Sequence, residues 1–314
     1  MSLIRPRALR PGATIAVVSP ASAAKADRVH AGVARLEELR YRAVIMPHTL
    51  DRGPLYYAGG AEDRAADLMA AFADSTIDGI VCTRGGWGSA ELLPLLDASI
   101  VRANPKVFAG YSDHTSLHIW LAREAGLITF YAPMVAADFS RADGVDLASW
   151  NHALVGDAQW KLGASDGLRV LRPGVGEGML AGGCISIFAQ SLGTPYAMPP
   201  AADAAPRVLF LEDIGMKPYQ WDRNLLHLKY AGLLDNVSGI VFGDMQQCVA
   251  PEDNALLEQA ILHALRDFAG PIAIGLRSGH VDAPNVTLPL GVRVRLDLSS
   301  AANPQLEFLE AATI

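Results

Sequence analysis

Ser112, Glu212 and His280 are the residues of this chain whose types and settings best suit nucleophilic catalysis. A serine hydroxyl becomes a nucleophile when a histidine takes its proton and an acid orients the imidazole. The order serine, acid, histidine along the chain is also found in other hydrolases that carry the nucleophile at a strand edge. Each residue has an ordinary structural interpretation as well, so the segments around it bear on its role.

The segment around Ser112 predicts a sharp turn between a buried strand and a helix. Val107-Phe-Ala109 is a short apolar run, and Gly110 permits a change of direction before a helix that is expected from Asp113. Such a turn lifts a hydroxyl out of the sheet and directs backbone N–H groups of the helix toward the reacting group. The pattern is that of a Gly-x-Ser-x-Gly nucleophile elbow, except that His114 occupies the last glycine position. A serine before an aspartate at a helix start is, however, more often only a cap.

A glycine-rich loop, Arg84-Gly-Gly-Trp-Gly-Ser89, follows the expected strand Gly79–Thr83. The loop lacks the Gly-Lys-Ser/Thr ending of a phosphate-binding loop, so a nucleotide site is not expected. Paired glycines would let backbone N–H groups approach a developing oxyanion. A tight turn without a ligand is the third interpretation.

His280 lies in a loop rich in glycine and proline, just after the expected strand Pro271–Gly275. An imidazole in that position is held at the carboxyl edge of a sheet, where ligands of α/β proteins bind. Glu212 ends an apolar strand that begins at Arg207, and a carboxylate there is costly to bury unless it is paired. Glu212 and its neighbour Asp213 could each be only a salt-bridge partner or a cap.

The other histidines and the cysteines do not predict a metal site, and no cofactor is expected. His114 and His118 are four residues apart on one helix face, but Thr115 stands where the zinc-binding His-Glu-x-x-His pattern has its glutamate. The three cysteines are widely spaced, which fits neither a disulfide framework nor a zinc knuckle. They indicate a reducing compartment.

The overall composition is that of a globular α/β protein, with 51% hydrophobic and 19% charged residues among 314. A net charge of −7 offers no electrostatic reason for binding nucleic acid or an anionic membrane. No apolar run approaches the roughly 18 residues of a membrane span, and the first residues do not resemble a signal peptide. We therefore expect a cytoplasmic protein with no nucleic-acid or membrane partner.

Strands alternating with helices predict an α/β fold built on a parallel sheet. The predicted organisation is an N-terminal domain over residues 1–150, a glycine-rich linker over 151–178 and a C-terminal domain over 179–314. Val292–Leu298 alternates apolar and charged residues, which predicts a half-exposed, antiparallel strand in the second domain.

Six blocks of the sequence, in order along almost the whole chain, resemble the LD-carboxypeptidase family of serine peptidases, which includes the microcin C immunity peptidases. The blocks are Pro11–Ser22, Cys82–Gly88, Gly110–Thr115, Leu211–Asp213, Pro218–Arg223 and Gly279-His280. The resemblance implies a flavodoxin-like N-terminal domain and a β-rich α/β C-terminal domain, with the active site between them. It implies a Ser112–His280–Glu212 triad and an oxyanion hole formed by the N–H groups of Gly86 and Asp113. It also implies a metal-independent homodimer that cleaves amide bonds between L- and D-configured centres in murein peptides.

The substrate expected from this resemblance is a small muropeptide, such as the tetrapeptide with its terminal D-alanine. A carboxypeptidase must hold the free carboxylate of its substrate, and Arg84 and Lys217 are the candidate cations. A microcin-type acyl-nucleotide is the alternative substrate, for which Trp87, Tyr219 and Trp221 could form an aromatic platform. A non-catalytic, two-lobed protein that binds small molecules is the alternative from another class.

Overall fold

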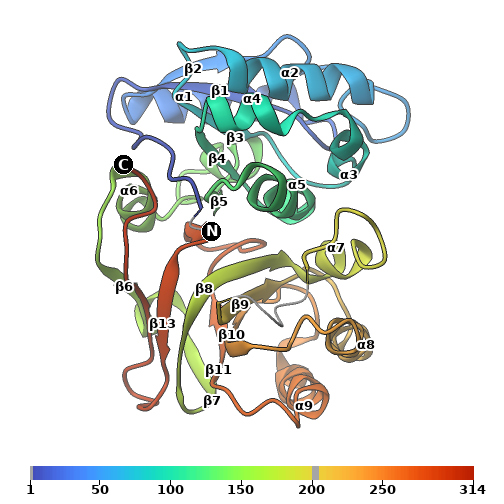
Figure 1. Ribbon diagram of the computed structural model, residues 1–314, viewed down its shortest axis with the longest axis vertical. Helices are drawn as coiled ribbons and strands as arrows, with labels where there is room; N and C mark the ends of the chain where they lie inside the picture. Colours follow the sequence, from blue (N-terminus) through green and yellow to red (C-terminus); the bar gives the residue numbers. More distant parts are fainter. Residues whose placement is uncertain (1–2, 200–204) are drawn as a thin grey trace. The chain divides into compact units, whose positions relative to one another are not determined.

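The computed structural model describes residues 3–199 and 205–314. The chain divides into two compact units (Figure 1). The N-terminal unit comprises Met1–Asp157, Asp282–Gly291 and Ala311–Ile314, and the C-terminal unit comprises Ala158–Val281 and Val292–Glu310. The α/β class predicted from the sequence is confirmed, with a mainly parallel sheet in the first unit and a large mixed sheet in the second.

The N-terminal unit is a sheet whose strands are parallel except for β12, which pairs with β5 in the antiparallel sense. In spatial order the strands are β12 (Leu288–Leu290), β5 (Thr129–Tyr131), β4 (Val107–Gly110), β3 (Gly79–Cys82), β1 (Thr14–Val18) and β2 (Arg42–Ile45). Strands β3 and β4 are fully buried, as expected for a parallel sheet that is covered on both faces.

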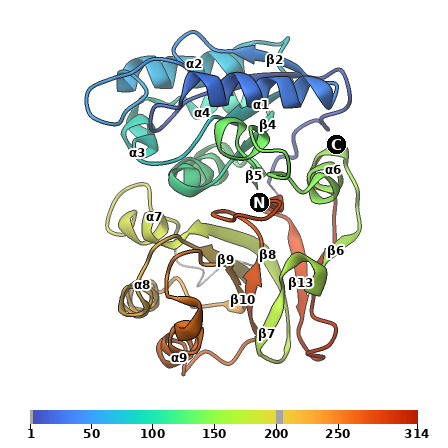
Figure 2. The ribbon, with the colours of Figure 1, turned by 180° about the vertical axis from the view of Figure 1, so that it is seen from behind.

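Helices cover both faces of this sheet, since α4 is nearest the viewer in Figure 1 and α1 is nearest after the half-turn to Figure 2. The helices of the unit are α1 (Ala26–Glu38), α2 (Ala61–Ala73), α3 (Ser89–Leu92), α4 (Ala98–Ala103), α5 (Thr115–Trp120) and α6 (Leu147–Val155). The helix expected from Asp113 begins as a 3-10 turn over Ser112–His114 and continues as α5.

The C-terminal unit has a sheet in which β8, β9, β10 and β11 are parallel and the flanking strands are antiparallel. In spatial order the strands are β6 (Trp160–Leu162), β14 (Gln305–Phe308), β13 (Arg293–Asp297), β8 (Val175–Cys184), β9 (Arg207–Glu212), β10 (Val237–Gly243), β11 (Ile272–Leu276) and β7 (Arg169–Arg172). The half-exposed, antiparallel strand predicted over Val292–Leu298 is β13.

The helices of the C-terminal unit are α7 (Ile185–Gln190), α8 (Pro218–Tyr230) and α9 (Asn254–Ala264). Helices α8 and α9 lie side by side in both views (Figures 1 and 2). Within the described residues of the whole chain, no helix is long and apolar enough to cross a bilayer.

The predicted linker over residues 151–178 differs from the structure, because this segment contains β6, β7 and the start of β8. Its glycines allow strands to pass closely instead of making the chain flexible. A Cβ on Gly176 would lie 2.1 Å from the carbonyl oxygen of Ser238, and one on Gly178 would lie 2.5 Å from that of Pro206. The chain passes from one unit to the other at 157/158 instead.

The predicted C-terminal boundary also differs, because two segments beyond residue 280 return to the N-terminal unit. Residues 282–291 add β12 to the edge of the first sheet, and residues 311–314 complete the same unit. These pairings join residues more than 150 positions apart, which local periodicity does not reveal.

Candidate active site

Ser112 occupies a strained turn directly after β4. Its φ is +65°, in the left-handed region that residues other than glycine rarely adopt. Its backbone N–H donates to Tyr131 Oη at 3.0 Å. Within the part of the N-terminal unit that the structure describes, Ser112 Oγ has no hydrogen-bond partner, so the serine does not cap the helix. The turn therefore has the form expected of a nucleophile elbow.

The glycine-rich loop after β3 packs against this turn. A Cβ on Gly85 would lie 2.9 Å from Ser112 Oγ, so a side chain at Gly85 would collide with the serine. Gly86 has a φ of +106°, and a Cβ there would lie 2.4 Å from Ser22 Oγ. Among the described residues, no protein atom accepts from the N–H groups of Gly86 and Asp113. Two donors beside the serine are thus available to an external oxyanion.

Ser22 and Arg64 brace the loop, and sequence reasoning did not find either of them. The N–H of Trp87 donates to Ser22 Oγ at 3.1 Å. The buried Arg64 side chain donates from Nη1 to the carbonyl oxygens of Gly88 at 2.9 Å and Pro20 at 2.7 Å. The signal for Arg64 was its place on the apolar face of α2, where an arginine is buried only when its donors are satisfied.

Asp113 and His114 in the 3-10 turn, and His118 in α5, are buried. The Asp113 carboxylate accepts the Ser89 N–H at 2.7 Å, and burial raises its pKa. Both ring nitrogens of His114 and of His118 lie within hydrogen-bond distance of a protein oxygen. These oxygens are Ser89 Oγ and Arg84 O for His114, and Thr129 Oγ1 and Gly110 O for His118. His114 therefore links the serine turn to the glycine-rich loop, and His118 links the end of β4 to β5.

Burial of these two histidines predicts that acid destabilises the protein. Burial lowers the pKa of His114 to about 3 and that of His118 to about 4. Below pH 6.5 the unfolded chain binds protons that the folded chain does not, so stability falls as the pH falls. Each histidine should contribute a loss of about 2 kcal/mol between pH 7 and pH 5. Burial raises the pKa of Asp138 to about 6, which offsets the loss by about 1 kcal/mol.

Urea unfolding at pH 7 and pH 5 measures this loss. His118→Gln should lower stability at pH 7 but show a smaller loss on acidification than the wild-type chain. His263→Gln, at an exposed position on α9, is the control and should lose as much as the wild-type chain. An equal loss in His118→Gln and wild type would contradict the assignment of a neutral, buried imidazole.

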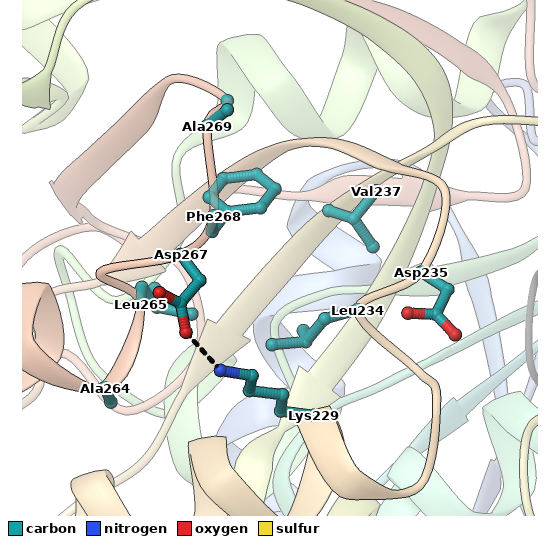
Figure 3. A pocket seen from close by; sticks show the side chains of 10 residues that line it. Lys229, Leu234, Asp235, Val237, Ala264, Leu265, Asp267, Phe268 and Ala269 are labelled. Atoms are coloured by element: carbon teal, nitrogen blue, oxygen red, sulfur yellow. Dashed lines mark hydrogen bonds and ion pairs between the residues drawn. The ribbon is translucent and has the colours of Figure 1, made fainter.

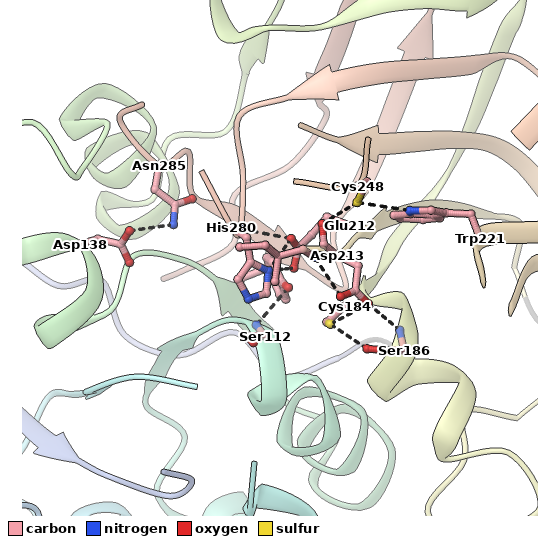
Figure 4. A network of polar contacts seen from close by, with 12 residues as sticks. Ser112, Asp138, Cys184, Ser186, Glu212, Asp213, Trp221, Cys248, His280 and Asn285 are labelled. Atoms are coloured by element: carbon pink, nitrogen blue, oxygen red, sulfur yellow. Dashed lines mark hydrogen bonds and ion pairs between the residues drawn. The ribbon is translucent and has the colours of Figure 1, made fainter. Parts of the chain in front are cut away.

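In the C-terminal unit, His280 and Glu212 form a close pair (Figure 4). Nδ1 of His280 lies 2.8 Å and 3.1 Å from the two oxygens of the Glu212 carboxylate. The backbone N–H of His280 also donates to Glu212 Oε2 at 3.1 Å. The carboxylate can only accept, so the proton of the neutral imidazole is on Nδ1 and Nε2 is the basic nitrogen.

Two glycines confine the Glu212 side chain, which is 1% exposed. A Cβ on Gly279 would lie 2.5 Å from Glu212 Cδ, and a Cβ on Gly243 would lie 2.6 Å from Glu212 Cβ. Gly279 also has a φ of +91°, which permits the turn that brings His280 back onto the carboxylate. The pair is thus held by backbone on two sides.

Asp213 points to different partners. Its Oδ2 accepts the N–H of Ser186 at 3.0 Å and the thiol of Cys184 at 3.3 Å, and its Oδ1 accepts the N–H of Ile214 at 2.9 Å (Figure 4). Burial raises the pKa of the Cys184 thiol, so this thiol is a neutral donor. Asp213 therefore connects the end of β9 to the start of α7.

The residues expected to contact substrate have different environments within their own units. Arg84 is exposed and Trp87 is half-buried in the N-terminal unit, and Lys217 is exposed in the C-terminal unit. Tyr219 is 67% exposed. Trp221, in contrast, is fully buried and donates to Cys248 Sγ at 3.5 Å, so its expected place in an aromatic platform is wrong. It belongs to the hydrophobic core because it lies on the inner face of α8.

A pocket of about 240 Å³ in the C-terminal unit lies beside the ends of α8 and α9 (Figure 3). Its charged residues include Lys229 and Asp267, which form an ion pair at 2.6 Å. None of the residues expected to act in catalysis or to bind substrate lines this pocket. The pocket is therefore not part of the candidate active site, whose elements are the serine turn and the His280–Glu212 pair.

Each unit of the chain matches a domain of one family of peptidases. Residues 15–132 match the LD-carboxypeptidase N-terminal domain, and residues 177–296 match the LD-carboxypeptidase C-terminal domain. The chain belongs to the LD-carboxypeptidase family, as the resemblance predicted. It is therefore a hydrolase of the carboxypeptidase type.

Several relatives are similar over nearly their whole length. A protein from Streptomyces coelicolor named putative carboxypeptidase is 37% identical over 305 residues, covering 94% of each chain. A Bacillus subtilis protein named probable murein peptide carboxypeptidase is 33% identical, covering 93% of this chain and 91% of that one. The crystal structure of an MccF-like protein from Bacillus anthracis has a TM-score of 0.88 at 26% identity, covering 98% of this chain and 99% of that one. A muramoyltetrapeptide carboxypeptidase from Oxalobacter formigenes has a TM-score of 0.81 at 27% identity, covering 95% of this chain and 99% of that one.

Proposed function

We propose that the protein is a serine carboxypeptidase that hydrolyses the amide bond between an L-centre and a terminal D-alanine in murein tetrapeptides. The observation that carries the chemistry is the left-handed turn at Ser112, which lies beside the unpaired N–H groups of Gly86 and Asp113. The substrate class is supported by the names of relatives from Bacillus subtilis and Oxalobacter formigenes.

In the proposed reaction Ser112 Oγ attacks the carbonyl carbon while His280 Nε2 takes the hydroxyl proton. Glu212 holds the imidazole through Nδ1 and stabilises its charged form. The N–H groups of Gly86 and Asp113 bind the tetrahedral oxyanion. The C–N bond then breaks, and His280 gives its proton to the leaving amine of D-alanine. Water attacks the acyl-enzyme in the same way and releases the shortened peptide.

The free carboxylate of D-alanine requires a cation, and we propose Arg84 or Lys217 for this role, with Trp87 as an additional contact. The exposure of both cations within their units supports the proposal, because their charged ends can reach a ligand. Arg84→Met and Lys217→Met are compared for KM. Replacing the residue that binds the carboxylate should raise KM about tenfold or more and change kcat little.

The alternative substrate is an acyl-nucleotide of the microcin C type. It is supported by the similarity to the MccF-like protein from Bacillus anthracis. The burial of Trp221 removes one of the three aromatic residues expected to contact a base. This observation favours the muropeptide over the acyl-nucleotide.

A direct comparison of substrates tests the proposal. Purified protein is incubated with murein tetrapeptide and, separately, with an acyl-sulfamoyl adenosine, and the products are identified by mass spectrometry. We expect release of D-alanine from the tetrapeptide at a much higher kcat/KM. Faster cleavage of the adenosine conjugate would instead assign the microcin-type activity. Cleavage of neither compound, together with no labelling of Ser112 by a fluorophosphonate, would indicate a binding protein.

We also propose that the enzyme acts in the cytoplasm as a homodimer. The dimer is what the family resemblance implies, and the wide spacing of the cysteines supports a reducing compartment. Sedimentation equilibrium should give twice the chain mass of 33.4 kDa. A mass that stays at the single-chain value at micromolar concentration would contradict the dimer.

A further inference from the structure

The left-handed conformation of Ser112 needs an explanation beyond the glycine-rich loop. An L-residue stays in this region of conformational space only where its surroundings enforce it. The loop explains how room is left for the serine side chain, because Gly85 has no Cβ to collide with it. It does not hold the backbone of Ser112. The carbonyl oxygen of Ser112 accepts the Thr115 N–H within the 3-10 turn. The Ser112 N–H donates to Tyr131 Oη at 3.0 Å, and this bond is the one that reaches outside the turn.

Tyr131 is well suited to hold a backbone group in place. It is the last residue of β5, is paired in register with Gly110 on β4, and is fully buried. Its ring is flanked by the rings of His118 and Tyr111, with centroid distances of 5.8 Å and 6.0 Å. The strand fixes the backbone of Tyr131 and the neighbouring rings fix its side chain. The hydroxyl oxygen is therefore held in place beside Ser112, which is two residues beyond the end of β4.

We propose that Tyr131 is a positioning residue for the reaction. Its hydroxyl oxygen accepts the Ser112 N–H and so maintains the left-handed conformation that presents Oγ. The inference rests on the proposed role of Ser112 as the nucleophile. The bond to Tyr131 has a second consequence. The N–H of Ser112 is already used, so the oxyanion must be bound by other donors, for which we propose the N–H groups of Gly86 and Asp113.

Tyr131→Phe tests the proposal, since it removes one oxygen and keeps the ring. The buried N–H of Ser112 then has no acceptor, and the turn can relax away from its productive geometry. We expect kcat for tetrapeptide hydrolysis and the rate of Ser112 labelling by a fluorophosphonate to fall together, by roughly 10- to 100-fold. KM should stay within about twofold of the wild-type value, because the substrate-binding groups are unchanged.

Tyr41→Phe is the matched control. Tyr41 is also a buried tyrosine of the N-terminal unit, and its hydroxyl accepts from Trp150 Nε1 at 3.3 Å. Tyr41→Phe should lower the melting temperature as Tyr131→Phe does but keep wild-type kcat and labelling. If Tyr131→Phe reduces kcat and labelling no more than Tyr41→Phe, the proposal is wrong.

Amide hydrogen exchange in the wild-type chain, followed by NMR, provides a measurement that needs neither a variant nor catalysis. The Ser112 amide should exchange at least about tenfold more slowly than the Asp113 amide, because only the former is hydrogen-bonded. Equal exchange rates would overturn the proposed bond. If Ser112→Ala remained active, the proposed function would fail, and the exchange result would still report on the contact between Tyr131 and Ser112.

Discussion

Ser112→Ala should fold as the wild-type chain does and lose on the order of 10⁴- to 10⁶-fold in turnover. The loss is large because serine, histidine and acid act as a unit, and the oxyanion donors and binding groups that remain supply only residual catalysis. Folding should be preserved because alanine is about as strained as serine at a φ of +65°. The backbone N–H of residue 112 also keeps its hydrogen bond to Tyr131. The measurement is kcat for release of D-alanine, with the melting temperature as the test of folding.

Ser116→Ala is the matched control for this variant. Ser116 is a buried serine of α5, four residues from Ser112, and we assign it no chemical role. Its replacement should leave turnover within about twofold of wild type. Retention of more than about a tenth of wild-type turnover by Ser112→Ala would remove Ser112 from the mechanism, because the loss of a triad member is far larger.

Glu212→Gln should reduce turnover by roughly 10³- to 10⁴-fold while keeping the size of the side chain. In the structure, the carboxylate accepts from both Nδ1 and the backbone N–H of His280. An amide has a single acceptor oxygen for these two donors, and its NH₂ group would face one of them. Either the imidazole takes the wrong tautomer or a buried donor loses its partner. The effect should be on kcat, measured on the same tetrapeptide.

Asp213→Asn is the comparison that decides which acid serves the histidine. Asp213 accepts from Ser186, Cys184 and Ile214, so its change should lower the melting temperature and reduce turnover by less than about tenfold. The assignment of Glu212 would be wrong if Asp213→Asn were the more damaging of the two. The reaction class could still hold in that case.

Local sequence patterns predicted the class of fold and offered candidates for the site, and the family resemblance selected the triad and the oxyanion donors from among them. The apolar run before Gly110 predicted β4, and the alternation over Val292–Leu298 predicted β13, because a strand buries its side chains with a period that a short window reveals. Ser112, Glu212 and His280 were candidates because each stands beyond, or at the end of, such a run, and Asp213 remained a competitor of Glu212 until the family resemblance was considered. The pairing of Glu212 with His280 depends on β9 and β11 ending at the same edge of one sheet and on the turn that Gly279 permits after β11.

The tertiary structure alone decided which segments share a unit and which groups support the chemical residues. The glycines between residues 151 and 178 suggested a linker, although they serve the close approach of strands, because a missing Cβ permits both. The return of residues 282–291 to the first sheet depends on a pairing with β5 that no local pattern encodes. For the same reason the contact of Tyr131 with Ser112 was not predicted. A tyrosine in a short strand is ordinary in sequence, and its hydroxyl acquires a role only when the fold brings a backbone N–H from 19 residues away within 3.0 Å.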